Sequence, residues 1–160
     1  MGKQKDIGTR FESGCVRYLR AATGDMRIRR SALAGAHDEG DIHGLYCHGM
    51  AGIAECKSVK SIGPALLRRF QDETETERGN ADAEWAALIV HVPGCDASGT
   101  KPSFARNSVY MTIRDLARVD LYLMEAARTT KPFQMHDEIW IRLSMGDFVR
   151  LITCDTEEVI

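Results

Sequence analysis

The spacing of apolar residues along the chain predicts two helices in its first half. Over residues 7–22 apolar side chains recur at intervals of three and four, which is typical of one face of an amphipathic helix, and Glu12 lies at the edge of that face. A second helix is predicted over residues 61–78, because Pro64 suits a first turn and apolar residues follow it. The far end of this second helix is acidic and is expected to face solvent.

The strands are predicted from shorter patterns. Residues 26–33 suggest a short strand, residues 34–41 a loop rich in Gly and Asp, and residues 41–57 two strands joined by a connection that contains glycine. Residues 85–92 form a continuous apolar run closed by Pro93, the pattern of a buried central strand. This order predicts an α/β domain whose central mixed sheet is flanked by helices.

A weak internal echo marks the second half of the chain. Residues 109–119 and 141–151 align without gaps at an offset of 32, which matches Asp115 with Asp147. Each segment predicts a strand followed by a helix, and an Asp at such a junction is expected to be the N-cap. We therefore interpret residues 95–160 as a strand-helix extension of one domain that spans residues 1–160.

Composition narrows the class of protein. A chain of 160 residues with 44% hydrophobic content can bury one core. It has no apolar run of about 20 residues and no apolar N-terminal leader, so a cytoplasmic protein without a membrane partner is expected. The five scattered cysteines include no Cys-x-x-Cys pair, which argues against disulfides and a zinc ribbon. Zinc ligands at His37, His43, Cys47 and His48 would be an alternative, although structural zinc sites favour tighter pairs.

Charge is distributed unevenly along the chain. The net charge is −2, but residues 1–30 carry eight Lys or Arg against three acids, and the remainder has an excess of seven acids. A basic N-terminal end is able to meet phosphate groups, although a solvated basic helix would give the same count.

The candidate chemistry lies in residues 40–60. Side chains alternate across a strand, so Glu55 and Lys57 are expected on one face and Cys56 on the other. A short connection would let the strand that begins at Asp41 pair antiparallel with this one and bring Asp41 beside Glu55. Clustered carboxylates repel unless a cation lies between them, so the pattern suggests a Mg²⁺ site.

These residues resemble those of a known nuclease superfamily. The sequence RFE ending at Glu12, the basic strand and loop over residues 29–41, the GD pair at Asp41 and the ECK of residues 55–57 are similar to the PD-(D/E)XK nucleases. Within them the chain looks most like the Holliday junction resolvases of archaea and bacteriophages, over residues 5–94. The resemblance implies a restriction-endonuclease-like core and a Mg²⁺-dependent endonuclease in which a metal-activated water hydrolyses a DNA phosphodiester.

The resemblance also implies roles for particular residues. Asp41 and Glu55 would bind Mg²⁺ together with the carbonyl of Cys56, and Glu12 would reach the same ion directly or through water. Lys57 would act on the water or the phosphate, and Gln71 would support the site from the second helix. Mn²⁺ is expected to substitute for Mg²⁺.

Partners follow from the same likeness. Members of this group are homodimers that cut opposing strands of a four-way junction, and a phage-encoded member would work in the cytoplasm of its bacterial host. Phosphate contacts are expected from Arg10, Arg29, Arg30 and Lys60, with residues 31–37 as a loop against the DNA. This chain departs from the family pattern in two places. Gly40, not proline, precedes the first acid, and Val92 stands where phage members often carry a basic residue.

Two other functions remain open from the sequence. A repair nuclease acting on flaps, ends or duplex sites would use the same core. A DNA-binding or assembly protein without catalysis would have no need to retain the costly Asp, Glu and Lys set. Trp85 and Trp140 are expected to be core or dimer anchors rather than platforms for base stacking.

Overall fold

A computed structural model of the chain describes residues 2–31, 38–120 and 139–153. Four α-helices and one 3₁₀ helix are present in these ranges: α1 (Gly2–Thr23), α2 (Pro64–Asn80), η1 (Pro102–Arg106), α3 (Ile113–Val119) and α5 (Met145–Thr153). The strands are β1 (Arg29–Arg30), β2 (Ile42–Cys47), β3 (Met50–Lys57), β4 (Trp85–Val90), β5 (Ser108–Thr112) and β6 (Trp140–Ser144). The loop expected against DNA lies, apart from Ser31, outside the described residues.

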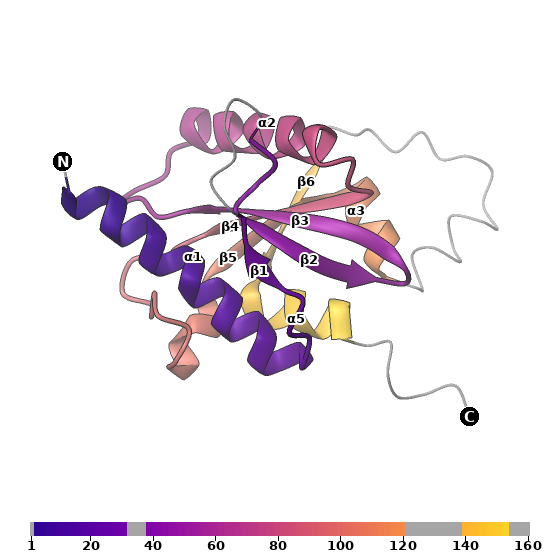
Figure 1. Cartoon of the computed structure of the whole chain (residues 1–160). Helices are drawn as coiled ribbons and strands as arrows, with labels where there is room; N and C mark the ends of the chain where they lie inside the picture. The colour runs from indigo at the N-terminus through magenta and orange to yellow at the C-terminus, as the bar shows by residue number, and fades with distance from the viewer. Residues whose placement is uncertain (1, 32–37, 121–138, 154–160) are drawn as a thin grey trace.

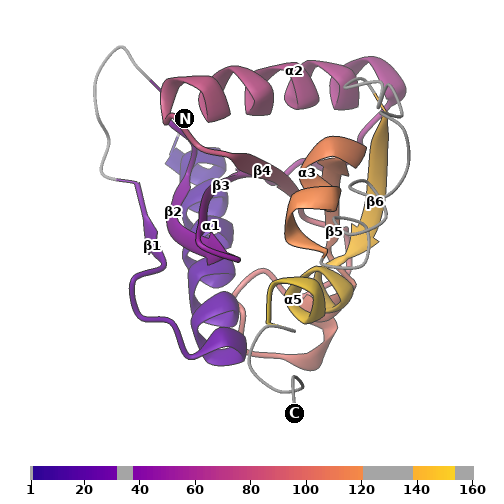
Figure 2. The same ribbon diagram turned by 90° about the vertical axis from the view of Figure 1, so that its right-hand side faces the viewer.

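The strands form one mixed sheet in the order β1-β2-β3-β4-β5-β6. β3 and β4 are parallel and are connected through α2, while the other neighbouring strands are antiparallel. Figure 1 shows α2 over one face of the sheet and α1 and α5 against the other. After a rotation of 90°, α3 lies between α2 and α5 (Figure 2). The predicted α/β class with a mixed sheet flanked by helices is confirmed.

The central strand β4 is buried on both faces because every residue in it is small or apolar. Trp85, Ala87 and Ile89 belong to the core beneath α1 and α5, while Leu88 and Val90 pack with Phe70 of α2. Trp85 is fully buried, and its indole N–H donates to the carbonyl of Met50 at 3.2 Å. The sequence-based expectation of a central strand here is confirmed, and Trp85 is a core residue.

The internal echo corresponds to two strand-helix units that pair with each other. β5 and β6 are antiparallel neighbours, with Ser108 opposite Ser144. The expected N-cap role of the two acids is wrong, because the preceding hydroxyl groups serve instead. The Thr112 hydroxyl accepts from the N–H of Asp115 at 3.0 Å, and the Ser144 hydroxyl accepts from the N–H of Asp147 at 3.1 Å. Each acid therefore occupies the third helical position of a capping motif.

Two further findings concern membrane-spanning helices and the cysteines. None of the helices in the described ranges has the length and apolar character needed to cross a membrane. The four described cysteines, Cys15, Cys47, Cys56 and Cys95, are free thiols, and the first three are buried.

Candidate functional site

Asp41 lies immediately before β2, and backbone N–H groups donate to both its side chain and its carbonyl. The antiparallel register of β2 and β3 sets Ile42 against Ala54, which places Asp41 opposite Glu55. One carboxylate oxygen of Asp41, Oδ2, accepts from the backbone N–H of Cys56 at 2.9 Å. The carbonyl of Asp41 accepts from the N–H of Ser31 at 2.7 Å. The antiparallel pairing expected from the sequence therefore brings Asp41 beside Glu55.

The backbone conformation at position 40 explains why a glycine precedes Asp41. Its φ is +89°, and a Cβ there would lie 3.0 Å from the Cδ1 atom of Ile53. Proline is restricted to φ near −65° and cannot adopt this conformation, whereas glycine can. The departure from the family pattern is thus a consequence of how this chain turns into β2.

Glu55 and Lys57 lie on the face of β3 that α2 covers. The side-chain ammonium of Lys57 is 2.7 Å from Oε1 of Glu55 and 3.0 Å from Oε2 of Glu73. The same ammonium lies 5.1 Å from the centre of the Phe70 ring. Burial alone would lower the pKa of Lys57, but the two carboxylates outweigh it and raise that pKa. Lys57 is therefore a fixed cation.

The acidic pair carries more negative charge than its surroundings compensate. Burial, and then the charge of Glu55, raise the pKa of Asp41 to about 8, although the Cys56 N–H opposes the shift. Burial also raises the pKa of Glu55 to about 8, with Lys57 lowering it and Glu77 raising it. Carboxyl groups in this state gain from a proton or from a metal cation.

Glu12 approaches this pair from α1, across the sheet from α2. Its Oε2 accepts from Nε and Nη2 of Arg30 at 3.0 and 2.5 Å. Its negative charge is also among the causes that raise the pKa of Asp41. The structure thus places Glu12 near Asp41 and pairs it with one of the arginines expected to bind phosphate.

Gln71 lies on α2, and helical spacing places it on the side that carries Glu75 and Arg78. Positions 71, 75 and 78 share one side of a helix, and Glu75 and Arg78 on that side form an ion pair with N–O distance 3.2 Å. The side of α2 that reaches β3 carries Glu73 and Glu77 instead. The supporting role expected of Gln71 stays a prediction.

Two acidic residues near the site were not expected from the sequence. Glu77 is 6% exposed, and Glu73 pairs with Lys57, so the expectation of a wholly solvated acidic end of α2 is wrong. The sequence contains a signal for the burial of Glu77, because Phe70, Thr74 and Glu77 are spaced by four and three residues, as on one face of a helix. All three are buried.

The donor set suits a hard divalent cation. Within the described ranges no three Asp, Glu, His or Cys side chains converge closely enough to bind one ion. Mg²⁺ does not need three, since it usually takes one or two carboxylates and keeps several waters. Oε2 of Glu55 is buried without a hydrogen-bond partner among the described residues. The carbonyl of Cys56 points to the same edge of β3 as its N–H, which is the edge occupied by Asp41.

The four candidate phosphate contacts are all exposed at the surface: Arg10, Arg29, Arg30 and Lys60. Arg30 touches the site through Glu12. Arg29 pairs with His43 across β1 and β2 and lines, with Arg27 and His43, a cavity of about 300 Å³. Arg30 therefore reaches the site from the β1 side, while Arg29 lies at a cavity that neither Asp41 nor Glu55 lines.

Comparisons of the chain with protein-family models, with curated proteins and with solved structures found no match. The likeness to PD-(D/E)XK nucleases, including the restriction-endonuclease-like fold, accordingly rests on the residues of this chain and stays a prediction.

Proposed function

We propose that this protein is a Mg²⁺-dependent endonuclease that resolves four-way DNA junctions, with a restriction-endonuclease-like core. The observation that carries the proposal is the pairing of Asp41 with Glu55 beside a fixed Lys57. The carboxylate of Asp41 accepts from the Cys56 N–H. Lys57 lies on the same face of β3 as Glu55, and its ammonium is 2.7 Å from the Glu55 carboxylate. Keeping a buried acid, a half-buried acid and a lysine together is costly in a protein that only binds DNA.

Each residue of the site has a role that its position allows. Asp41, Glu55 and the carbonyl of Cys56 would hold Mg²⁺, with Glu12 reaching it directly or through water. When bound, Mg²⁺ supplies an activated water and offsets the charge that develops on the phosphate. Lys57 is oriented by Glu55 and Glu73, so its remaining hydrogen can be directed at a phosphate oxygen or at the attacking water.

The surrounding charges fit a DNA partner. Arg10, Arg29, Arg30 and Lys60 would contact backbone phosphates, which positions the duplex without reading its sequence. Two copies in a homodimer would present paired sites to opposing strands of a junction. This activity implies a cytoplasmic location, which would be the cytoplasm of the bacterial host if the protein is phage-encoded.

The test is a cleavage assay with four-way junctions, flaps, splayed arms and linear duplex, with Mg²⁺, Mn²⁺ or a chelator. Junctions should be cut in preference to duplex, and only with a metal ion. Asp41→Asn and Glu55→Gln should bind junctions yet cut at least about 10³-fold more slowly, a loss of about 4 kcal/mol of transition-state stabilisation. Asp72→Asn, an exposed position on α2, is the control and should cut normally.

Three results would contradict parts of the proposal. Normal cutting by both site variants would remove the assignment of the site. Preference for flaps or ends would indicate a repair nuclease. Junction binding that ignores Mg²⁺, with no cleavage of any substrate, would indicate a protein that binds DNA without catalysis.

A further inference from the structure

Glu77 on α2 is a buried acid that neither the sequence motif nor the family resemblance assigns. We propose that Glu55 and Glu77 are the two carboxylates that bind the divalent cation directly, with Asp41 contacting the ion through water. This inference rests on the proposed metal site and adds a ligand to it. It makes α2 part of the site through Glu77, where the resemblance implied Gln71.

The contact between the two glutamates carries the inference. The carboxyl groups of Glu55 and Glu77 lie within hydrogen-bonding reach of each other. Both groups are acceptors when ionised, so nothing joins them except a shared proton or a cation. Each residue also has one buried oxygen, Oε2, without a hydrogen-bond partner in the described part of the chain. With exposed fractions of 5% for Glu55 and 6% for Glu77, water reaches neither group freely.

The nearest cation is already engaged. The ammonium of Lys57 lies 2.7 Å from the other oxygen of Glu55, Oε1, and 3.0 Å from Glu73. Lys57 therefore offsets about one of the two charges it touches and leaves the Oε2 atoms of Glu55 and Glu77 unmatched. A buried carboxylate without a partner is costly, and a bound divalent ion would remove that cost.

The chain around Glu77 relieves its charge only in part. Burial is the main cause that raises the pKa of Glu77 to about 7; the contact with Glu55 and the charge of Lys57 oppose the shift, and the charges of Asp38 and Asp41 add to it. Asn80, one turn further along α2, donates to the carbonyl of Asp38 at 2.7 Å. This bond fixes the segment that leads into Asp41 against the end of α2, so the acids from both elements are held together.

Calorimetric titration of Mn²⁺ into the whole protein, without DNA, tests the inference. Glu77→Gln keeps the shape of the side chain and its ability to hydrogen-bond Glu55, but a neutral amide is a much weaker ligand. We expect Mn²⁺ affinity to fall at least about 10-fold. The metal-free variant should unfold at a higher temperature than the wild type, and Mn²⁺ should raise that temperature less. Asp72→Asn, the same charge change on an exposed position of α2, should leave both readouts unchanged.

A double-mutant cycle locates the effect. If Glu55 and Glu77 hold one ion, the losses of Mn²⁺ affinity in Glu55→Gln and Glu77→Gln will not add in the double variant. Unchanged Mn²⁺ affinity in Glu77→Gln would overturn the inference, because a shared proton alone would then explain the contact. A Glu77→Gln protein that fails to fold would overturn it as well, since removing an unmatched charge should not destabilise the metal-free state.

The outcome is separable from that of the proposed function. If Asp41→Asn loses Mn²⁺ binding and junction cleavage while Glu77→Gln binds Mn²⁺ as the wild type does, the nuclease stands and the added ligand falls. If the wild type cuts no DNA but its Mn²⁺ affinity depends on Glu77, the ligand stands and the nuclease falls.

Discussion

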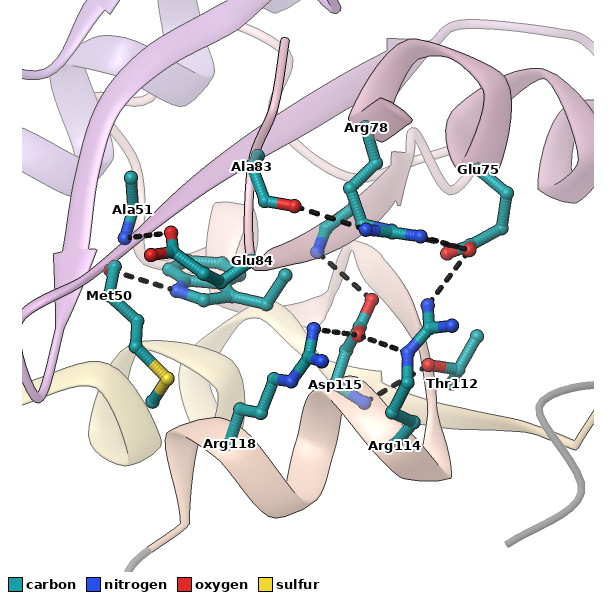
Figure 3. Close-up of polar contacts among 12 residues, drawn as sticks. Met50, Ala51, Glu75, Arg78, Ala83, Glu84, Thr112, Arg114, Asp115 and Arg118 are labelled. Atoms are coloured by element: carbon teal, nitrogen blue, oxygen red, sulfur yellow. Dashed lines mark hydrogen bonds and ion pairs between the residues drawn. The ribbon is translucent and has the colours of Figure 1, made fainter. Parts of the chain in front are cut away.

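Two buried acids, Asp115 on α3 and Glu55 on β3, have opposite surroundings. Asp115 is fully buried at the start of α3, and Figure 3 shows it inside a network of arginines and backbone N–H groups. Its oxygens accept from the N–H of Ala86 at 3.0 Å and from Nε of Arg114 at 3.0 Å, with Arg118 at 3.6 Å. Arg114 also reaches Glu75 on α2 at 2.8 Å.

Glu55 has one cation, Lys57, and faces other acids. Two arginines and a backbone N–H surround a single charge at Asp115, whereas Glu55, which lies near Asp41 and Glu77, pairs with a lysine that also pairs with Glu73. The difference teaches how to separate a structural acid from a ligand-binding one in this fold. A compensated buried acid joins helices to the sheet, while an uncompensated group of acids is suited to receive a cation.

The largest expected effect on stability comes from breaking the compensated acid. Asp115→Ala leaves Arg114 and Arg118 without their buried partner and the Ala86 N–H without an acceptor, so we expect a loss of about 3–5 kcal/mol in the free energy of unfolding. Urea unfolding measures it. The matched control is Asp147→Ala at the equivalent position of α5, whose side chain is 56% exposed, and it should cost less than about 1 kcal/mol. Equal losses at both positions would contradict the distinction.

The second effect is the response of the uncompensated acids to pH. The pKa values of Asp41 and Glu55 are raised to about 8 in the folded state. Between about pH 4 and pH 8 the folded state therefore holds protons that the unfolded state has released. The metal-free protein should lose stability as the pH rises through this range. We expect the midpoint of thermal unfolding to fall by about 5 °C or more between pH 5 and pH 8. Added Mg²⁺ should reverse the loss at pH 8.

The double variant Asp41→Asn, Glu55→Gln is the control for this pH response, because it removes both titrating groups. Its unfolding temperature should change less over the same range. A metal-free wild type that is more stable at pH 8 than at pH 5 would count against the uncompensated cluster.

The smallest expected effect separates the contribution of helix capping to stability from that of the arginine network. Ser144 caps α5 as Thr112 caps α3, but its partner Asp147 is exposed, so Ser144→Ala should cost only about 1 kcal/mol in unfolding free energy. Ser61→Ala, at an exposed position ahead of α2, is the control and should stay within about 0.5 kcal/mol. A loss as large as that of Asp115→Ala would show that the cap, rather than the charges, stabilises this motif.

Local patterns were enough to predict the first half of the site. Alternation along β3 put Glu55 and Lys57 on one face, and a short connection set Asp41 opposite Glu55, as the register of Ile42 with Ala54 bears out. The two strand-helix units of the echo were also predictable. Their caps do not follow from the pattern, because a capping motif has two polar positions and the sequence does not show whether the hydroxyl or the acid accepts the helix N–H.

By itself the sequence determined the helices and strands, the buried central strand and the close approach of Asp41 and Glu55, since these depend on periods of two and 3.6 residues and on short connections. Only the tertiary structure decided which side of α2 faces β3. Packing of Phe70 against Leu88 and Val90 sets the rotation of that helix, and the rotation turns Glu77 toward Glu55. A rotation about a helix axis depends on contacts between residues far apart in the chain, which no local pattern contains.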